Sequence, residues 1–219
     1  SWESAPMLGC KLVMGLLSQL TVLLFDEEGV QEPSLEILQQ GCSTIIRYLE
    51  QVNLALQTFH LNLPCFKLFS FPPELVSSPS RPVPQQGRLI SVCLAGNQLE
   101  TLPPSMGALT AMTRLDLSKN KLSRTSAVMG AWQRLEFLDL SGNSINELPS
   151  TIGNMRHLKV LNLSDNLLSA LPPYMAKLVN LRELYLHGNK LEVLYAGIDK
   201  CSSLSTLSLS NNCFPSLPY

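Results

Sequence analysis

Apolar and polar residues alternate in a pattern that recurs every 23 residues through the second half of the chain. Each copy has the frame LxxLxLxxNxL, in which L is an apolar residue and x is any residue. The frames begin at Leu89, Met112, Leu135, Leu158, Leu181 and Leu204, and their asparagines are Asn97, Asn120, Asn143, Asn166, Asn189 and Asn212. Six copies without a slip indicate one supersecondary unit that is repeated in tandem.

The frame itself predicts a short strand followed by a turn. Its LxL core directs two side chains to one face, such as Leu115 and Leu117, and the residue between them, Asp116, to the other. One such strand cannot bury its apolar face alone, so we expect the copies to stack as a parallel sheet about 4.8 Å apart. The asparagine amide can both donate and accept hydrogen bonds, so its column should satisfy buried backbone groups in the turns.

The segments between strands carry apolar residues at the same spacing, which predicts a second layer of core. One column contains Met106, Met129, Ile152, Met175 and Ile198, and the other contains Leu109, Trp132, Met155, Leu178 and Cys201. Four strands are followed by a Leu-Pro pair, at residues 102–103, 148–149, 171–172 and 217–218. Proline suits a segment that leaves a sheet. The second and fifth copies have Thr125-Ser126 and Leu194-Tyr195 instead, and we expect local changes there.

With these motifs, the chain resembles the leucine-rich-repeat family over residues 89–219, and specifically its intracellular, Ras-suppressor-like subclass with 23-residue repeats. The resemblance implies an α/β solenoid with a parallel sheet on its concave face. It also implies a role in binding other proteins. It is nearly silent about which partner is bound.

Residues 63–88 predict a degenerate capping repeat and a loop rich in serine and proline. Subtracting 23 from the first frame places Phe66, Phe69 and Phe71 on the strand positions, followed by Glu74 and Val76. The asparagine is lost in this copy. The alternative is an ordinary apolar connector.

Residues 1–62 predict a helical hairpin. Apolar residues from Leu35 to Phe59 follow one another in steps of three and four, which predicts one amphipathic helix that has Ser34 as its N-cap and ends before Pro64. Residues 7–25 are apolar nearly all round and predict a second, buried helix. The apolar stripe either caps the N-terminal edge of the solenoid or docks onto a partner within a larger assembly.

The net charge and the cysteine positions limit which partners, metal sites and cellular locations are expected. The net charge of −1 gives no sign of a nucleic-acid or anionic-membrane partner. The charge-free run 12–25 is shorter than the roughly 20 residues of a membrane-spanning helix. The six cysteines form no CxxC pair and do not cluster at the ends of the repeats, as they do in extracellular proteins of this family. We therefore expect no metal, reduced thiols, and an intracellular, mainly cytoplasmic location; an organelle or cytoskeletal complex stays open.

No catalytic motif is present, so we expect neither an enzyme nor a cofactor. The outward strand positions are the candidate site, because aromatic residues ringed by charges are typical of protein-binding hot spots. The predicted partner-binding residues are Arg114, Asp116, Phe137, Asp139, Asn162, Glu183, Tyr185 and His187. The predicted function is protein–protein interaction or scaffolding through the concave face. The alternatives are an accessory subunit of a large complex that is anchored by the hairpin, and the recognition region of a longer signalling enzyme.

The two edges of the solenoid should differ. Apolar residues such as Phe214 and Leu217 follow the last asparagine, so the C-terminal edge should be apolar and open. We expect further repeats or another subunit to cover it.

Overall fold

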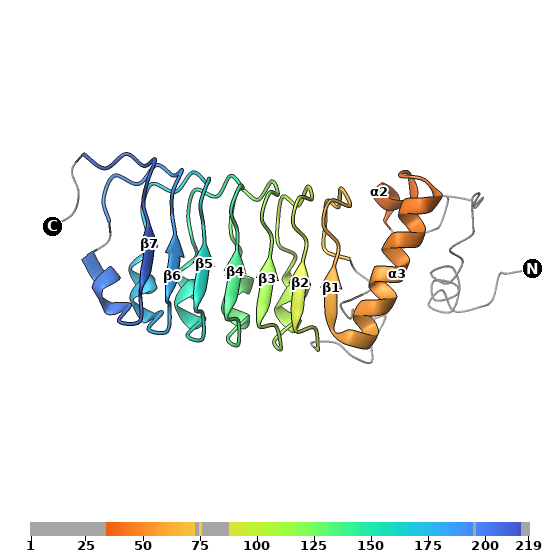
Figure 1. Cartoon of the computed structure of the whole chain (residues 1–219), viewed down its shortest axis with the longest axis horizontal. Helices are drawn as coiled ribbons and strands as arrows, with labels where there is room; N and C mark the ends of the chain where they lie inside the picture. Colours follow the sequence, from red (N-terminus) through yellow and green to blue (C-terminus); the bar gives the residue numbers. More distant parts are fainter. Residues whose placement is uncertain (1–33, 73–74, 76–87, 195, 216–219) are drawn as a thin grey trace, which may run out of the picture.

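Seven short strands form one parallel sheet along the length of the molecule (Figure 1). The computed structural model describes residues 34–72, 75, 88–194 and 196–215. The strands are β1 (His60–Asn62), β2 (Ser91–Cys93), β3 (Arg114–Asp116), β4 (Phe137–Asp139), β5 (Val160–Asn162), β6 (Glu183–Tyr185) and β7 (Thr206–Ser208). From β2 onward, each residue pairs with the one 23 positions later, as Leu115 does with Leu138. The predicted α/β repeat solenoid is confirmed.

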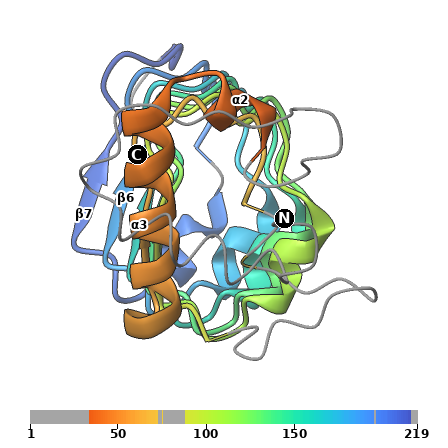
Figure 2. The same ribbon diagram turned by 90° about the vertical axis from the view of Figure 1, so that its right-hand side faces the viewer.

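The return segments form a second layer opposite the sheet (Figure 2). Each contains one turn-like 3-10 helix: η2 (Pro104–Ala108), η3 (Ala127–Ala131), η4 (Ser150–Asn154), η5 (Pro173–Lys177) and η6 (Ala196–Lys200). The return after Ser126 keeps the same helix although it lacks the Leu-Pro pair, because the serine hydroxyl accepts a hydrogen bond from the Val128 N–H. The core lies between the layers, where the Trp132 ring nitrogen donates to the Met106 carbonyl at 2.9 Å.

The asparagine of every LxxLxLxxNxL frame bonds to the repeat that precedes it. Asn120 shows the pattern: its amide nitrogen donates to the carbonyls of Leu94 (2.9 Å) and Leu117 (3.0 Å), and its oxygen accepts the Leu99 N–H (3.0 Å). The same bonds recur at Asn97, Asn143, Asn166, Asn189 and Asn212. Each asparagine therefore closes the turn of its neighbour as well as its own.

The capping repeat exists, but its strand is β1, and the prediction that put Phe66, Phe69 and Phe71 on the strand was wrong. His60 pairs with Ser91, 31 residues later instead of 23. The extra residues therefore lie in the return segment, which can lengthen without disturbing the ladder. At this offset Phe66 occupies the place of the asparagine, and Leu68 donates to Asn97 as Leu99 does to Asn120. Glu74, Val76 and the serine- and proline-rich loop lie outside the described residues.

The predicted single helix is two helices, α2 (Leu35–Leu38) and α3 (Cys42–Thr58). The chain breaks at Gly41, whose φ of 88° belongs to a region that is open essentially only to glycine. Helix α3 covers the N-terminal end of the sheet (Figure 1), and its Tyr48 and Leu49 are buried in the same core as the repeats. This packing agrees with the capping interpretation of the stripe, and docking onto a partner stays a prediction. The predicted helix over residues 7–25 lies outside the described residues.

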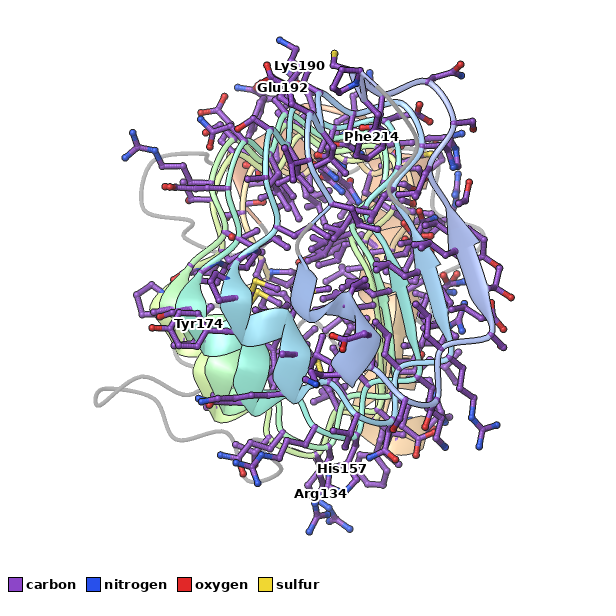
Figure 3. All side chains as sticks on the ribbon, turned by 90° about the vertical axis from the view of Figure 1, so that its left-hand side faces the viewer. Arg134, His157, Tyr174, Lys190, Glu192 and Phe214 are labelled. Carbon is purple, nitrogen blue, oxygen red and sulfur yellow. The ribbon has the colours of Figure 1, made fainter. Side chains whose placement is uncertain are left out.

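At the C-terminal end of the described residues, apolar core side chains are partly exposed. Leu207 on β7 is 38% exposed, whereas Leu184, its partner on β6, is fully buried. Phe214 is only partly buried against this core and lies at the same end (Figure 3). What covers this edge stays a prediction.

Candidate interaction surface

The outer sheet face, defined here as the outward side chains of β2–β6 and the turns that follow these strands, gathers the predicted partner-binding residues. In each of these strands the central residue is buried, and its two neighbours point outward. Because the strands are in register, side chains 23 residues apart lie side by side in rows. The structure therefore brings Arg114, Asp116, Phe137, Asp139, Asn162, Glu183, Tyr185 and His187 together over the adjacent strands β3–β6.

Arg114 and Phe137 form a stacked pair at the start of β3 and β4. The guanidinium carbon of Arg114 lies 3.6 Å from the centre of the Phe137 ring. Phe137 is half-buried for this reason, where the sequence suggested an exposed aromatic ring. A cation held over a ring leaves the guanidinium edge available for a carboxylate.

Asp116, Asp139 and Asn162 form the next row. Each uses one side-chain oxygen to accept the backbone N–H and the hydroxyl of the serine two residues later. The Asn162 amide also donates to the second oxygen of Asp139 at 3.0 Å. Among the residues that the structure describes, the second oxygen of Asp116 has one hydrogen-bond contact, with the Cys93 thiol 4.0 Å away. Asp116 is consequently the carboxylate of this row that is best placed to receive a partner's cation.

The far end of the surface is polar and hydrogen-bonded. The Tyr185 hydroxyl donates to Glu183 at 2.8 Å, and this bond raises the pKa of Tyr185 above its ordinary value. His187 lies 3.9 Å from the Asp165 carboxylate and 3.4 Å from the Ser208 hydroxyl. These contacts fix side chains that would otherwise lose rotamer entropy on binding.

The thiol of Cys93, on β2, is partly buried. Burial raises the pKa of the Cys93 thiol, which makes it a poor nucleophile near neutral pH. Within the described part of the chain, no three His, Cys, Asp or Glu side chains converge as a metal site would require. None of the described helices combines the length and apolarity needed to cross a membrane.

A recess that was missed from the sequence lies beside the sheet. It is lined by Phe59, Arg88, Ile90, Ala111, Thr113 and Arg134. The signal that could have revealed it is the column formed by residues 88, 111 and 134, in which an alanine stands between two arginines at the repeat spacing.

Comparison with known proteins identifies the repeat unit. A family profile described as a leucine-rich-repeat region matches residues 88–216. A leucine-rich-repeat protein of Leptospira interrogans has a TM-score of 0.59 and 30% identity, over 60% of this chain and 34% of its own. The ectodomain of the Arabidopsis thaliana membrane receptor kinase GASSHO1/SCHENGEN3, in complex with CASPARIAN STRIP INTEGRITY FACTOR 2, has a TM-score of 0.55 and 36% identity, over 60% of this chain and 17% of its own. The match thus spans about a third or less of either protein, and a comparison with curated proteins gave no match.

Proposed function

Because the chain belongs to the leucine-rich-repeat family, whose fold is generally a protein-interaction module, we propose that it binds a protein partner through the outer sheet face. The observation that carries this proposal is the Arg114–Phe137 stack beside the Asp116 carboxylate. An aromatic ring, a cation and an anion on neighbouring strands form the kind of mixed patch from which hot spots are built.

The patch also favours a particular partner chemistry. A carboxylate of the partner would meet the guanidinium edge of Arg114, and a lysine or arginine would meet Asp116. An apolar side chain would extend the stack over Phe137. The matching receptor ectodomain is in complex with another protein factor, which supports recognition as the general role of such repeats.

The accessory-subunit alternative has less support. Its anchor would be the apolar stripe of the helical region, but Leu49 and Val52 of α3 are buried against the core next to β1 and are not available to a partner. We also propose an intracellular location; the cysteine spacing supports it.

A double variant tests the proposed surface. Partners are first identified by affinity purification and mass spectrometry, and the affinity of one purified partner is then measured. Phe137→Ala with Tyr185→Ala should weaken binding by about 2 kcal/mol or more, roughly thirtyfold, because it removes both aromatic anchors.

The matched control is Tyr174→Ala, an exposed tyrosine on the return-segment side (Figure 3). It should leave the affinity within about twofold of the parent. If the control variant loses affinity and the double variant, still folded by circular dichroism, does not, the partner binds elsewhere and the proposal fails.

A further inference from the structure

We propose that the solenoid has a second binding site, for an acidic peptide segment that inserts one apolar side chain. The site is the recess beside β2 and β3, with a volume of about 420 Å³. It lies on the strand-start edge, defined here as the edge of the sheet at which the strands begin. It is separate from the outer sheet face.

The recess exists because one column of side chains is interrupted. Residues 88, 111 and 134 occupy equivalent places in three successive repeats, and Ala111 is short where its neighbours are arginines. Adjacent strands lie about 4.8 Å apart, so the backbones of Arg88 and Arg134 are separated by about 10 Å. That gap accommodates one side chain between two guanidinium groups.

The floor of the recess is apolar and held by the backbone ladder. The Ile90 N–H donates to the Phe59 carbonyl, and the Thr113 N–H donates to the Ile90 carbonyl, both at 2.8 Å. Phe59 belongs to the apolar stripe of the sequence, yet it lies outside the buried core and is only half-buried. Its φ of 63° is uncommon for a bulky residue. Ile90 is 38% exposed.

The rim of the recess is positive. The Arg88 guanidinium lies 4.5 Å from the Phe59 ring centre, and within the described residues neither Arg88 nor Arg134 has a carboxylate partner. Figure 3 shows Arg134 and His157 extending from this edge, away from Lys190, Glu192 and Phe214.

Further along the strand-start edge, Arg156 and Arg182 are exposed, whereas the carboxylate of Glu136 is paired with Lys159 at 2.7 Å. Within the described part of the chain, Arg88 and Arg134 thus stand without a carboxylate partner around an apolar hollow. The complement of that surface is a carboxylate-rich segment with an apolar side chain.

A peptide fits this edge better than a nucleic acid does. A nucleic acid requires a continuous row of cations along its phosphates and exposed rings on which bases stack. Here the cations are separated by Ala111 and Asn180, and the Phe59 ring is covered by Arg88. A hollow of one-side-chain width instead selects for an anchor residue.

Two defined peptides test the inference on the whole chain. Both have nine residues of mixed Glu and Asp, with either Phe or Ser at the centre. The Phe peptide should bind at least about tenfold more tightly, because burying its ring is worth more than 1.4 kcal/mol. Ala111→Arg should abolish this preference although it adds positive charge, since the new side chain fills the hollow and matches the residues at 88 and 134.

Arg134→Gln should weaken both peptides severalfold. The matched control Arg124→Gln removes the same charge from an exposed arginine in the return segment between β3 and η3, away from the strand-start edge, and should change affinity by less than about twofold. The Phe137→Ala, Tyr185→Ala double variant should bind both peptides as the parent does. The proposal for the recess and the proposal for the outer sheet face can therefore be refuted independently of each other.

Three outcomes would overturn the inference: neither peptide binds, the Phe preference survives in Ala111→Arg, or the two Gln variants lose affinity equally. Tighter binding of a ten-uridine RNA or of phosphatidylserine vesicles than of the Phe peptide would assign the edge to polyanions and would likewise overturn it.

Discussion

At the scale of single residues, one asparagine tests whether the ladder stabilises the fold. Asn143 bonds to the Leu117 and Leu140 carbonyls and accepts the Leu122 N–H at 2.9–3.0 Å. Asn143→Ala should lower the free energy of unfolding by about 1–3 kcal/mol, because these backbone groups lose their partner. Urea unfolding followed by circular dichroism measures the change.

Asn146→Ala is the matched control, because Asn146 is an exposed asparagine in the same repeat. Its effect should stay within about 0.5 kcal/mol. Equal losses of unfolding free energy in the two variants would mean that the hydrogen bonds of Asn143 do not stabilise the fold.

The thiols give a second prediction at this scale. Burial raises the pKa of Cys93, and the nearby Asp116 carboxylate raises it further, so less thiolate is present at any pH below that value. Iodoacetamide at pH 8 should therefore label Cys93 more slowly than the exposed Cys213, as measured by peptide mass spectrometry. Asp116→Asn should speed the labelling of Cys93 and leave that of Cys201 unchanged. Labelling of Cys93 at the rate of Cys213 would contradict the prediction.

At the scale of elements, the break between α2 and α3 depends on one backbone conformation. Gly41 has φ 88° and ψ 164°, and nothing lies within 4 Å of the place where a Cβ would stand. Gly41→Ala should therefore destabilise the chain by about 1–3 kcal/mol through backbone strain alone. Thermal unfolding measures this loss. A rise in helical circular dichroism with unchanged stability would instead mean that α2 and α3 had merged into one helix.

The same elements show what the sequence can and cannot predict. The strands from β2 onward were predictable, because one strict period fixes both strand and turn. The break at Gly41 was not, because the step from Leu38 to Cys42 continues a helical stripe through it. The strand of the capping repeat was missed because a fixed offset assumes returns of equal length.

The two candidate binding sites were also predictable only where the repeat period determines them. Alternation along a strand predicts that Arg114 and Phe137 point outward, but their stacking depends on side-chain packing between repeats. The recess was predictable only in part: the short Ala111 between Arg88 and Arg134 marks its place, but its floor depends on where α3 ends and thus on the placement of Phe59.

At the scale of the whole molecule, the two ends of the described core are unlike each other. Helix α3 closes the N-terminal end, where Tyr48 meets Phe66 edge to face with ring centres 5.9 Å apart. The opposite end exposes Leu207. In a solenoid each repeat is held mainly by its neighbours, so the exposed Leu207 marks an edge that a further repeat or a partner would stabilise.

The backward reach of the asparagines gives the molecule a mechanical direction. Asn212 and the equivalent asparagines each hydrogen-bond to the turn of the preceding repeat. A force applied at the C-terminus therefore unfolds the last repeat first, and this breaks the hydrogen bonds that its asparagine makes to the repeat before it. In optical tweezers the chain should lengthen in steps of about 80 Å, the contour length of one 23-residue turn. With Asn189→Ala, the step that unfolds the repeat preceding Asn189 should occur at lower force, because its turn has lost these hydrogen bonds. One rupture of the entire solenoid would show that the turns unfold together and that this direction has no mechanical effect.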